Sequence, residues 1–134
     1  MGLEKIYQLT TSGGWRLRLE LKAKNGTNDL WSDREYDTFL IDSETNGYAL
    51  HIAMKGFGTE GDVLNVAGGN CQNGMKFSTI DRDNDNLSGS CASNHKEGFW
   101  YNACYAVNFR YVQNPANKPI IKLLADRMMM KLSN

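Results

Sequence analysis

The chain has 134 residues, which suits one domain able to bury a single core without many cross-links. Lys plus Arg and Asp plus Glu each number 15, so the net charge is zero and the chain lacks the strong field that holds nucleic acids or anionic membranes. It also contains neither a run of eighteen apolar residues nor a signal peptide at its start. We therefore expect neither nucleic-acid binding nor membrane insertion.

The first predicted element is a helix of about two turns over residues 3–9, which Gly13 and Gly14 would end. From Trp15 to Lys24 apolar and charged residues alternate strictly, which is typical of a strand with one buried face. The residues predicted to face the core are Leu17, Leu19 and Leu21.

Two further strands are predicted, over residues 31–42 and 48–54, and together with the first strand they would form an antiparallel meander. We expect Trp15 and Trp31 to belong to the core, because bulky aromatics in strands are usually buried. Asp33, Glu35 and Asp37 alternate along the second strand, and we expect them on its solvated face rather than in a glycosidase site.

From Gly56 onward the periodicity fades, and Gly, Asn, Asp and Ser dominate as far as Gly98. Such a stretch must satisfy its backbone through turns, side chains or a bound ion. An apolar run at residues 119–132 predicts a closing strand. The predicted fold is α+β: an antiparallel β-sheet with a short helix over about residues 1–68, followed by a loop-rich calcium-binding subdomain over about residues 69–134.

The segment from Asp81 to Gly89 places three carboxylates at alternate positions. Calcium takes six to eight oxygen ligands, and a tight turn can offer carboxylates and main-chain carbonyls together. An EF-hand is excluded, because Asn86 stands where that loop needs glycine and Ala92 where it needs a bidentate glutamate. From spacing alone, a solvated turn with Asx hydrogen bonds is the more common explanation of such a motif.

Several segments occur in the order and spacing of a known family, and together they span nearly the whole chain. They are Tyr36-Asp37-Thr38-Phe39, Tyr48-Ala49-Leu50, Gly58-Thr59-Glu60-Gly61-Asp62, Gly74-Met75-Lys76-Phe77-Ser78-Thr79, Asp81 to Asp85, Cys91-Ala92, and Gly98-Phe99-Trp100-Tyr101-Asn102-Ala103-Cys104. In these segments the chain resembles the fibrinogen C-terminal domain of fibrinogens, ficolins and angiopoietins. Relative to that family it looks truncated at the N-terminus and shortened near the C-terminus.

The resemblance implies a calcium site in the acidic loop. Asp83 and Asp85 would bind Ca²⁺ through their side chains, and Leu87 and Gly89 through their main-chain carbonyls, whereas Asp81 would not touch the ion. It also implies a disulfide between Cys91 and Cys104 and a cis peptide bond between Ala103 and Cys104.

The resemblance further places a ligand pocket beside the calcium loop. The matching positions are Asn94, His95, Ala103, Cys104 and Tyr105, and we add Trp100, an aromatic that can stack on a sugar. The implied function is calcium-dependent recognition of an acetylated carbohydrate, as in innate-immune lectins.

Three alternatives stay open: a module that binds a receptor or another extracellular protein ligand, a truncated paralogue without a working pocket, and an enzyme. We predict that it is not an enzyme, since no hydrolase, P-loop or metalloprotease motif is present. Cys71 has no partner among the three cysteines, so it would be either a free thiol or a link between chains in an oligomer. The sequon Asn25-Gly26-Thr27 and the implied disulfide indicate a secreted protein.

Overall fold

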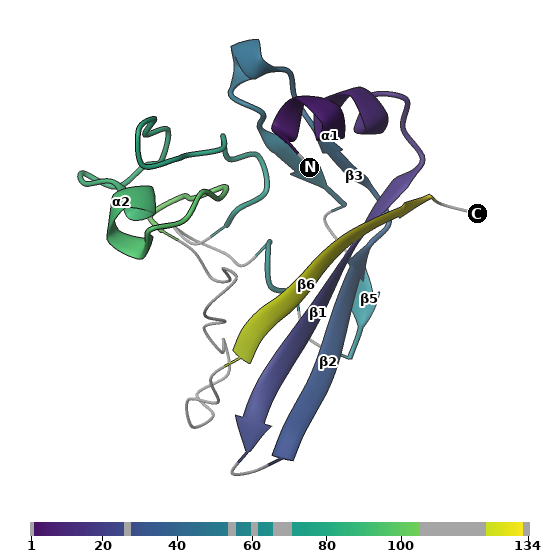
Figure 1. Ribbon diagram of the computed structural model, residues 1–134. Coiled ribbons are helices and arrows are strands. Elements are labelled where there is room, and N and C mark those ends of the chain that lie inside the picture. Colours follow the sequence, from purple (N-terminus) through teal and green to yellow (C-terminus); the bar gives the residue numbers. More distant parts are fainter. Residues whose placement is uncertain are drawn as a thin grey trace.

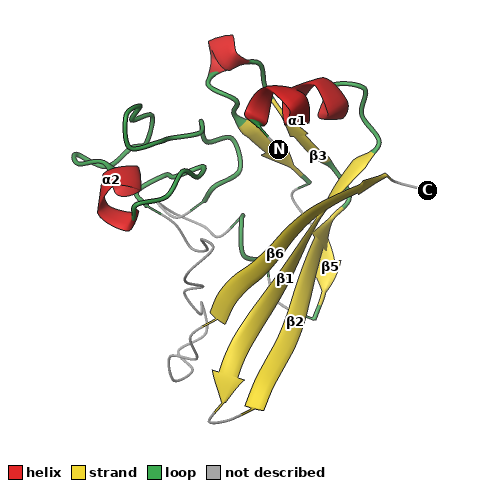
Figure 2. Cartoon of the chain, viewed as in Figure 1, coloured by secondary structure: helices red, strands yellow, loops and turns green. Residues whose placement is uncertain are grey.

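The computed structural model of the chain describes residues 2–25, 28–53, 56–59, 62–65, 71–104 and 123–132. It contains a four-stranded sheet with the strand order β5-β2-β1-β6 and a two-stranded sheet formed by β3 and β4 (Figures 1 and 2). The strand pairs are antiparallel and the helices are short. The predicted α+β fold class is therefore confirmed, whereas the single meander is wrong because the strands form two sheets.

The four-stranded sheet is built around β1 (Trp15–Asn25). β2 (Asn28–Tyr36) forms a hairpin with it, and β6 (Leu123–Leu132) returns from the far end of the chain to pair along its other edge (Figure 1). The short strand β5 (Gly56–Gly58) extends the sheet beyond β2. Leu17 and Leu19 are 0% and 2% exposed, which confirms the predicted inward face, and the side chain of Leu21 lies outside the described part.

The smaller sheet lies beside α1 (Leu3–Thr10). It consists of β3 (Phe39–Ile41) and β4 (Leu50–Ile52), with the 3₁₀ turn Glu44–Asn46 between them. The buried Thr10 hydroxyl donates a hydrogen bond to the Ile6 carbonyl oxygen at 2.8 Å and accepts one from the Ile41 amide at 3.3 Å. This side chain therefore connects the end of α1 to the small sheet.

The strand predicted over residues 31–42 is two strands. Tyr36 and Phe39 are both buried, at 0% and 2% exposure, although residues three apart point to opposite faces of a regular strand. The chain satisfies both by bending at Asp37 and Thr38, and β3 then enters the other sheet.

The outer face of the β1–β2 hairpin differs from the prediction at two residues. Trp31 is 54% exposed rather than in the core, and the Lys22 ammonium lies 5.1 Å from the centroid of its ring. Glu35, expected in solvent, is only 4% exposed, and its Oε1 accepts a hydrogen bond from Arg18 Nη1 at 2.7 Å. Arg18 Nη1 also lies 3.0 Å from Asp33 Oδ2 and Arg18 Nε lies 3.3 Å from Glu20 Oε1, so one guanidinium serves three carboxylates.

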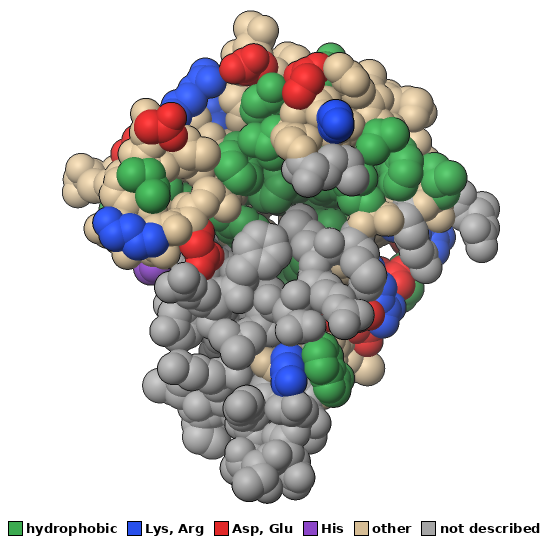
Figure 3. Space-filling view, viewed as in Figure 1, with side chains coloured by type: hydrophobic (Ala, Val, Ile, Leu, Met, Phe, Trp, Pro, Cys, Tyr) green, Lys and Arg blue, Asp and Glu red, His purple; other side chains and the backbone are tan. Residues whose placement is uncertain are grey.

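Residues 71–104 form the loop-rich part, and its one helix among the described residues is α2 (Cys91–His95). An isolated pair of hydrogen bonds between Ser78 and Phe99 closes it into a compact unit. Figure 3 shows hydrophobic side chains gathered between α1 and this unit, where Leu3 and Phe77 line a pocket of about 170 Å³. The predicted division near residue 68 falls outside the described residues and stays a prediction.

Candidate calcium and ligand site

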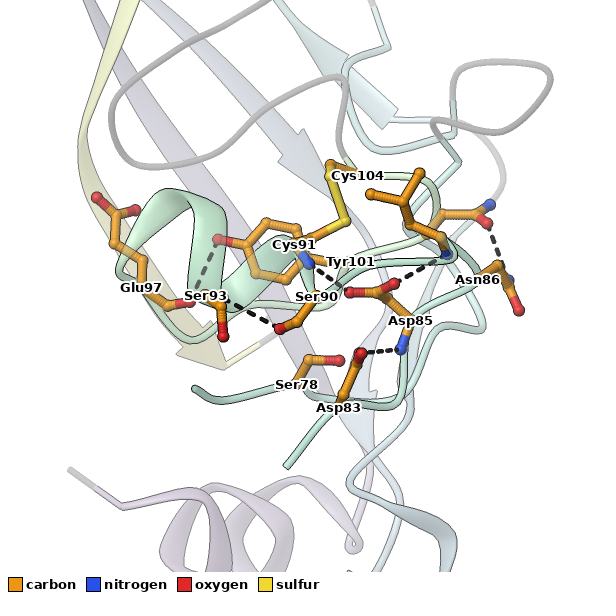
Figure 4. Close-up of a disulfide and its surroundings, with 12 residues drawn as sticks. Ser78, Asp83, Asp85, Asn86, Ser90, Cys91, Ser93, Glu97, Tyr101 and Cys104 are labelled. Carbon is orange, nitrogen blue, oxygen red and sulfur yellow. Dashed lines mark hydrogen bonds between the residues drawn. A yellow bond between two sulfur atoms is a disulfide. The ribbon is translucent and has the colours of Figure 1, made fainter. Parts of the chain in front are cut away.

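The acidic loop curls through two consecutive Asx turns. Asp83 Oδ1 accepts a hydrogen bond from the Asp85 amide at 3.2 Å, and Asp85 Oδ1 accepts one from the Leu87 amide at 2.9 Å (Figure 4). These bonds are the ones expected for a solvated turn, which was the alternative to a metal site. The hydrogen bonding within the loop therefore fits both explanations.

The second oxygen of Asp85 ties the loop to α2. Asp85 Oδ2 accepts a hydrogen bond from the Cys91 amide at 2.8 Å, and the carboxylate lies between the loop and the first turn of the helix (Figure 4). The Ser90 hydroxyl caps the same turn by accepting from the Ser93 amide at 3.1 Å. The position of Asp85 is thus fixed by the helix as well as by its own turn.

Asp81 behaves differently from the other two aspartates. Its Oδ1 accepts a hydrogen bond from the Thr79 hydroxyl at 2.7 Å, and this bond holds the pKa of the Asp81 carboxyl below its usual value. Asp81 is exposed and bonds away from the Asp83–Leu87 turns. The minor role that the resemblance gives Asp81 stays a prediction.

The donor set implied for the ion is two carboxylates and two main-chain carbonyls, which are the hard oxygen ligands that calcium prefers. Each Asp85 oxygen receives one N–H and keeps further lone pairs for a cation. Among the described residues no group of three or more His, Cys, Asp or Glu side chains is placed to hold a metal. The loop fits calcium only as a weak site that depends on main-chain oxygens.

The disulfide joins the two chain segments that carry the predicted ligand residues. Cys91 and Cys104 are bonded, with their Cα atoms 5.4 Å apart, and the peptide bond between Ala103 and Cys104 is cis, as the resemblance implies. Asn94 and His95 lie at the far end of the short helix that begins at Cys91. Asn94 and Ala103 are exposed and so accessible to a ligand.

Trp100 does not join this group. Trp100 is 4% exposed, and its Nε1 donates a hydrogen bond to the Tyr48 carbonyl oxygen at 2.8 Å. Its ring packs edge-on against Phe77 and Phe99, so it serves the core and offers no stacking platform. Tyr105 lies outside the described residues, and its predicted role stays a prediction.

His95 is partly buried beside Tyr101, with ring centroids 6.0 Å apart and an interplanar angle of 27°. Tyr101 is itself fully buried, and its hydroxyl donates to the Glu97 carbonyl oxygen at 3.3 Å. The His95 ring is therefore supported from one side by a fixed aromatic.

Asn86 and Asn102 were not predicted as site residues, yet they join the loop to the ligand segment. The Asn86 amide donates to the Asn102 carbonyl oxygen at 3.0 Å, and Asn86 Nδ2 donates to Asn102 Oδ1 at 2.9 Å. Both residues lie within motifs noted above, but their pairing across 16 positions leaves no trace in local sequence.

Comparisons with known proteins bear on this arrangement. The family model described as the C-terminal globular domain of fibrinogen beta and gamma chains matches residues 1–118. The chain belongs to the fibrinogen C-terminal domain family. It is 37% identical to fibrinogen-like protein 1 of Bos taurus over 114 residues, which are 81% of this chain and 35% of that protein. With human ficolin-3 the identity is 34% over 118 residues, covering 87% of this chain and 37% of the relative.

Solved structures of the family have the same fold. The fibrinogen-like globe domain of human ANGPTL6 superposes with a TM-score of 0.76 at 27% identity, covering 99% of this chain and 63% of that one. Lamprey fibrin D-dimer, complexed with the peptide Gly-His-Arg-Pro-amide, gives a TM-score of 0.72 at 26% identity, covering 98% and 48%. The chain spans about a third of the length of fibrinogen-like protein 1 and ficolin-3. No helix among the described residues is long and apolar enough to cross a membrane.

Proposed function

We propose that this fibrinogen-like chain is an extracellular recognition module, not an enzyme, whose ligand segment is organised by calcium. The observation that carries the proposal is the bond from Asp85 to the Cys91 amide, because Cys91 is disulfide-bonded to Cys104 in the ligand segment. Asp85 is thus connected to the cis peptide bond through one hydrogen bond, to Cys91, and one disulfide, from Cys91 to Cys104. The ficolin and angiopoietin-related relatives support recognition as the general role.

In this proposal Asp83, Asp85 and the carbonyls of Leu87 and Gly89 hold the ion. Calcium supplies positive charge that offsets the repulsion between the two carboxylates. Asp85 then keeps α2 in place, and the disulfide ties Cys104 to the helix that carries Asn94 and His95. A ligand site whose parts are fixed in advance loses less entropy on binding.

The ligand we propose is an acetylated carbohydrate. A partly buried histidine ring and the exposed residue Ala103 offer apolar surface near hydrogen-bonding groups, which suits an acetamido group. Asn94 adds an exposed side-chain amide that both donates and accepts. With Tyr105 these residues make up the proposed contact set.

A peptide or protein ligand is the second candidate, and the match to lamprey fibrin in complex with a tetrapeptide amide favours it. Competition separates the two. N-acetylglucosamine should elute a lectin from an acetylated matrix and should leave a peptide-binding module attached to its partner.

The calcium proposal predicts a shift in thermal unfolding. A loop with two carboxylate ligands should bind with a dissociation constant of about 10⁻⁴ to 10⁻³ M, as extracellular modules do. Calcium at 100 times that constant stabilises the folded state by about 2.7 kcal/mol, which raises the midpoint by several degrees. We expect this rise in the parent, relative to chelator, and its loss in Asp83→Ala.

Asp81→Asn is the matched control, because it removes a neighbouring charge without removing a proposed ligand. It should keep the calcium response of the parent. If Asp83→Ala also keeps the response, or if the parent shows none, the acidic loop is a solvated turn and the calcium proposal is wrong.

A further inference from the structure

Asn102 uses all of its hydrogen-bonding groups within the site. Its amide donates to the Cys104 carbonyl oxygen at 2.9 Å, and its own carbonyl oxygen accepts from the Asn86 amide at 3.0 Å. In the side chain, Oδ1 accepts from Asn86 Nδ2 at 2.9 Å and Nδ2 donates to the Cys71 carbonyl oxygen at 2.9 Å. These four bonds reach three separate parts of the chain: the acidic loop, the residue after the cis peptide bond and the segment that starts at Cys71.

The neighbouring residues Asp85 and Asn86 attach the acidic loop to both segments that the disulfide joins. Asp85 holds the amide of Cys91, at one end of the disulfide. Asn86 holds Asn102, two residues before the other end at Cys104. A disulfide alone lets the two segments it joins rotate relative to each other. Two attachments to a common loop remove that freedom.

We propose that Asn86 and Asn102 are positioning residues of the ligand site, which fix the segment from Asn102 to Cys104 against the acidic loop. The proposal rests on the proposed function, because it takes from there that the segment from Asn102 to Cys104 binds the ligand. The hydrogen-bonded pair itself is tested in chelator, without calcium.

The chemistry of the pair explains why an amide stands at position 86. Its Nδ2 must donate to Asn102 Oδ1, because Asn102 Nδ2 is used by the Cys71 carbonyl. Aspartate at position 86 has nearly the same size but cannot donate, and it would bring two acceptors together. Alanine keeps the main-chain bond between the two residues and removes the side-chain bond, together with a 3.5 Å contact from Asn86 Nδ2 to Met75 Sδ.

Hydrogen exchange of the whole chain in chelator tests the pair residue by residue. In Asn86→Ala the Asn102 amide should exchange about two- to tenfold faster than in the parent, as expected for losing one net hydrogen bond. The Cys91 amide, held by Asp85, should be unchanged. Asn86→Asp should accelerate the Asn102 amide at least as much as Asn86→Ala, because it sets an acceptor against Asn102 Oδ1. Asn46→Ala, a change of the same kind in the 3₁₀ turn, should leave Asn102 unaffected.

A double-mutant comparison shows whether the two side chains act through each other. Adding Asn86→Ala to Asn102→Ala should cause no further acceleration at the amide of residue 102, which donates to the Cys104 carbonyl oxygen, because the shared side-chain bond is already absent. Additive effects would overturn the proposal. So would an unchanged Asn102 amide in both Asn86 variants, or an equal acceleration at Cys91, which would indicate general loosening of the loop.

Repeating the exchange measurement with calcium separates this inference from the proposed function. Slower exchange at Asn102 in the parent with calcium, lost in Asn86→Ala, supports both. If calcium has no effect on the parent while the results in chelator hold, the calcium proposal fails and the positioning role of Asn86 and Asn102 stands.

Discussion

Replacing Cys91 and Cys104 together by alanine should lower the free energy of unfolding by about 3 kcal/mol. The two residues are 13 positions apart, and the chain-entropy model assigns about that value to a cross-link that closes a loop of this length. Cys91 is also fully buried, so its replacement removes core packing in addition to the covalent bond. The effect should be at least as large as that of calcium removal, because the lost core packing adds to the lost cross-link.

Urea unfolding of the double variant and the parent measures this difference. Cys71→Ala is the control, because Cys71 is a partly exposed free thiol and its loss should change the free energy of unfolding by less than about 1 kcal/mol. Equal stabilities of the parent and the double variant would show that the disulfide contributes little, and the attachment of α2 would then have to rest on Asp85 alone.

The main sheet was the part of the fold most accessible from the sequence. Strict alternation from Trp15 fixes which face of β1 is buried, and the exposures of Leu17 and Leu19 agree with it. The same rule applied to β2 would also have placed Trp31 outside, since it is an even number of residues from Asp33. The prediction of Trp31 in the core rests on the usual burial of aromatics. In a hairpin, however, the position of a residue along the strand determines which face of the sheet its side chain is on.

Glu35 shows the reverse case. Periodicity places it on the outer face correctly, but it cannot show that Arg18, on the neighbouring strand, covers it. The register pairs these two residues directly across the hairpin. A buried carboxylate next to a guanidinium is a property of the strand pairing, which the sequence of either strand alone does not contain.

The acidic loop and the disulfide were accessible through the family resemblance, whereas the connections between them were not. The bond from Asp85 to Cys91 spans six residues and the pair Asn86–Asn102 spans 16. Trp100 was misjudged for a related reason. From the sequence, an aromatic beside a ligand segment can equally stack on a ligand or pack in the core. The burial of Trp100 against Phe77 and Phe99 shows that it packs in the core.

The Tyr36 hydroxyl is the centre of a buried hydrogen-bond cluster, and Tyr36→Phe should destabilise the protein by about 2–6 kcal/mol. The hydroxyl accepts from the Leu64 amide at 3.0 Å and the Val63 amide at 3.2 Å, and it donates to Asp62 Oδ1 at 2.8 Å. Phenylalanine fills nearly the same volume but leaves both amides without this acceptor, and each buried unsatisfied group costs about 1–3 kcal/mol. Val63 and Leu64 are 3% and 0% exposed, so water cannot easily replace the hydroxyl.

The same hydroxyl should make stability depend on pH. Burial, and then the hydrogen bond to Asp62, raise the pKa of Tyr36 above its ordinary value of 10.0. Above that pH the unfolded chain loses the phenolic proton while the folded chain keeps it, so the free energy of unfolding falls as the pH rises, by up to about 1.4 kcal/mol per pH unit. Below pH 10 both states are protonated and the contribution is constant.

Urea unfolding at a series of pH values from about 8 to 11 separates this effect from other titrations. Both proteins should carry Cys71→Ala, because a thiolate would attack the disulfide at high pH. The parent should lose stability above pH 10 more steeply than Tyr36→Phe, and the difference between the two curves belongs to Tyr36 because every other tyrosine is present in both. Parallel curves would mean that the folded protein releases the Tyr36 proton as readily as the unfolded chain. The hydroxyl would then be open to solvent, and the cluster with Asp62 would not hold Val63 and Leu64 in the core.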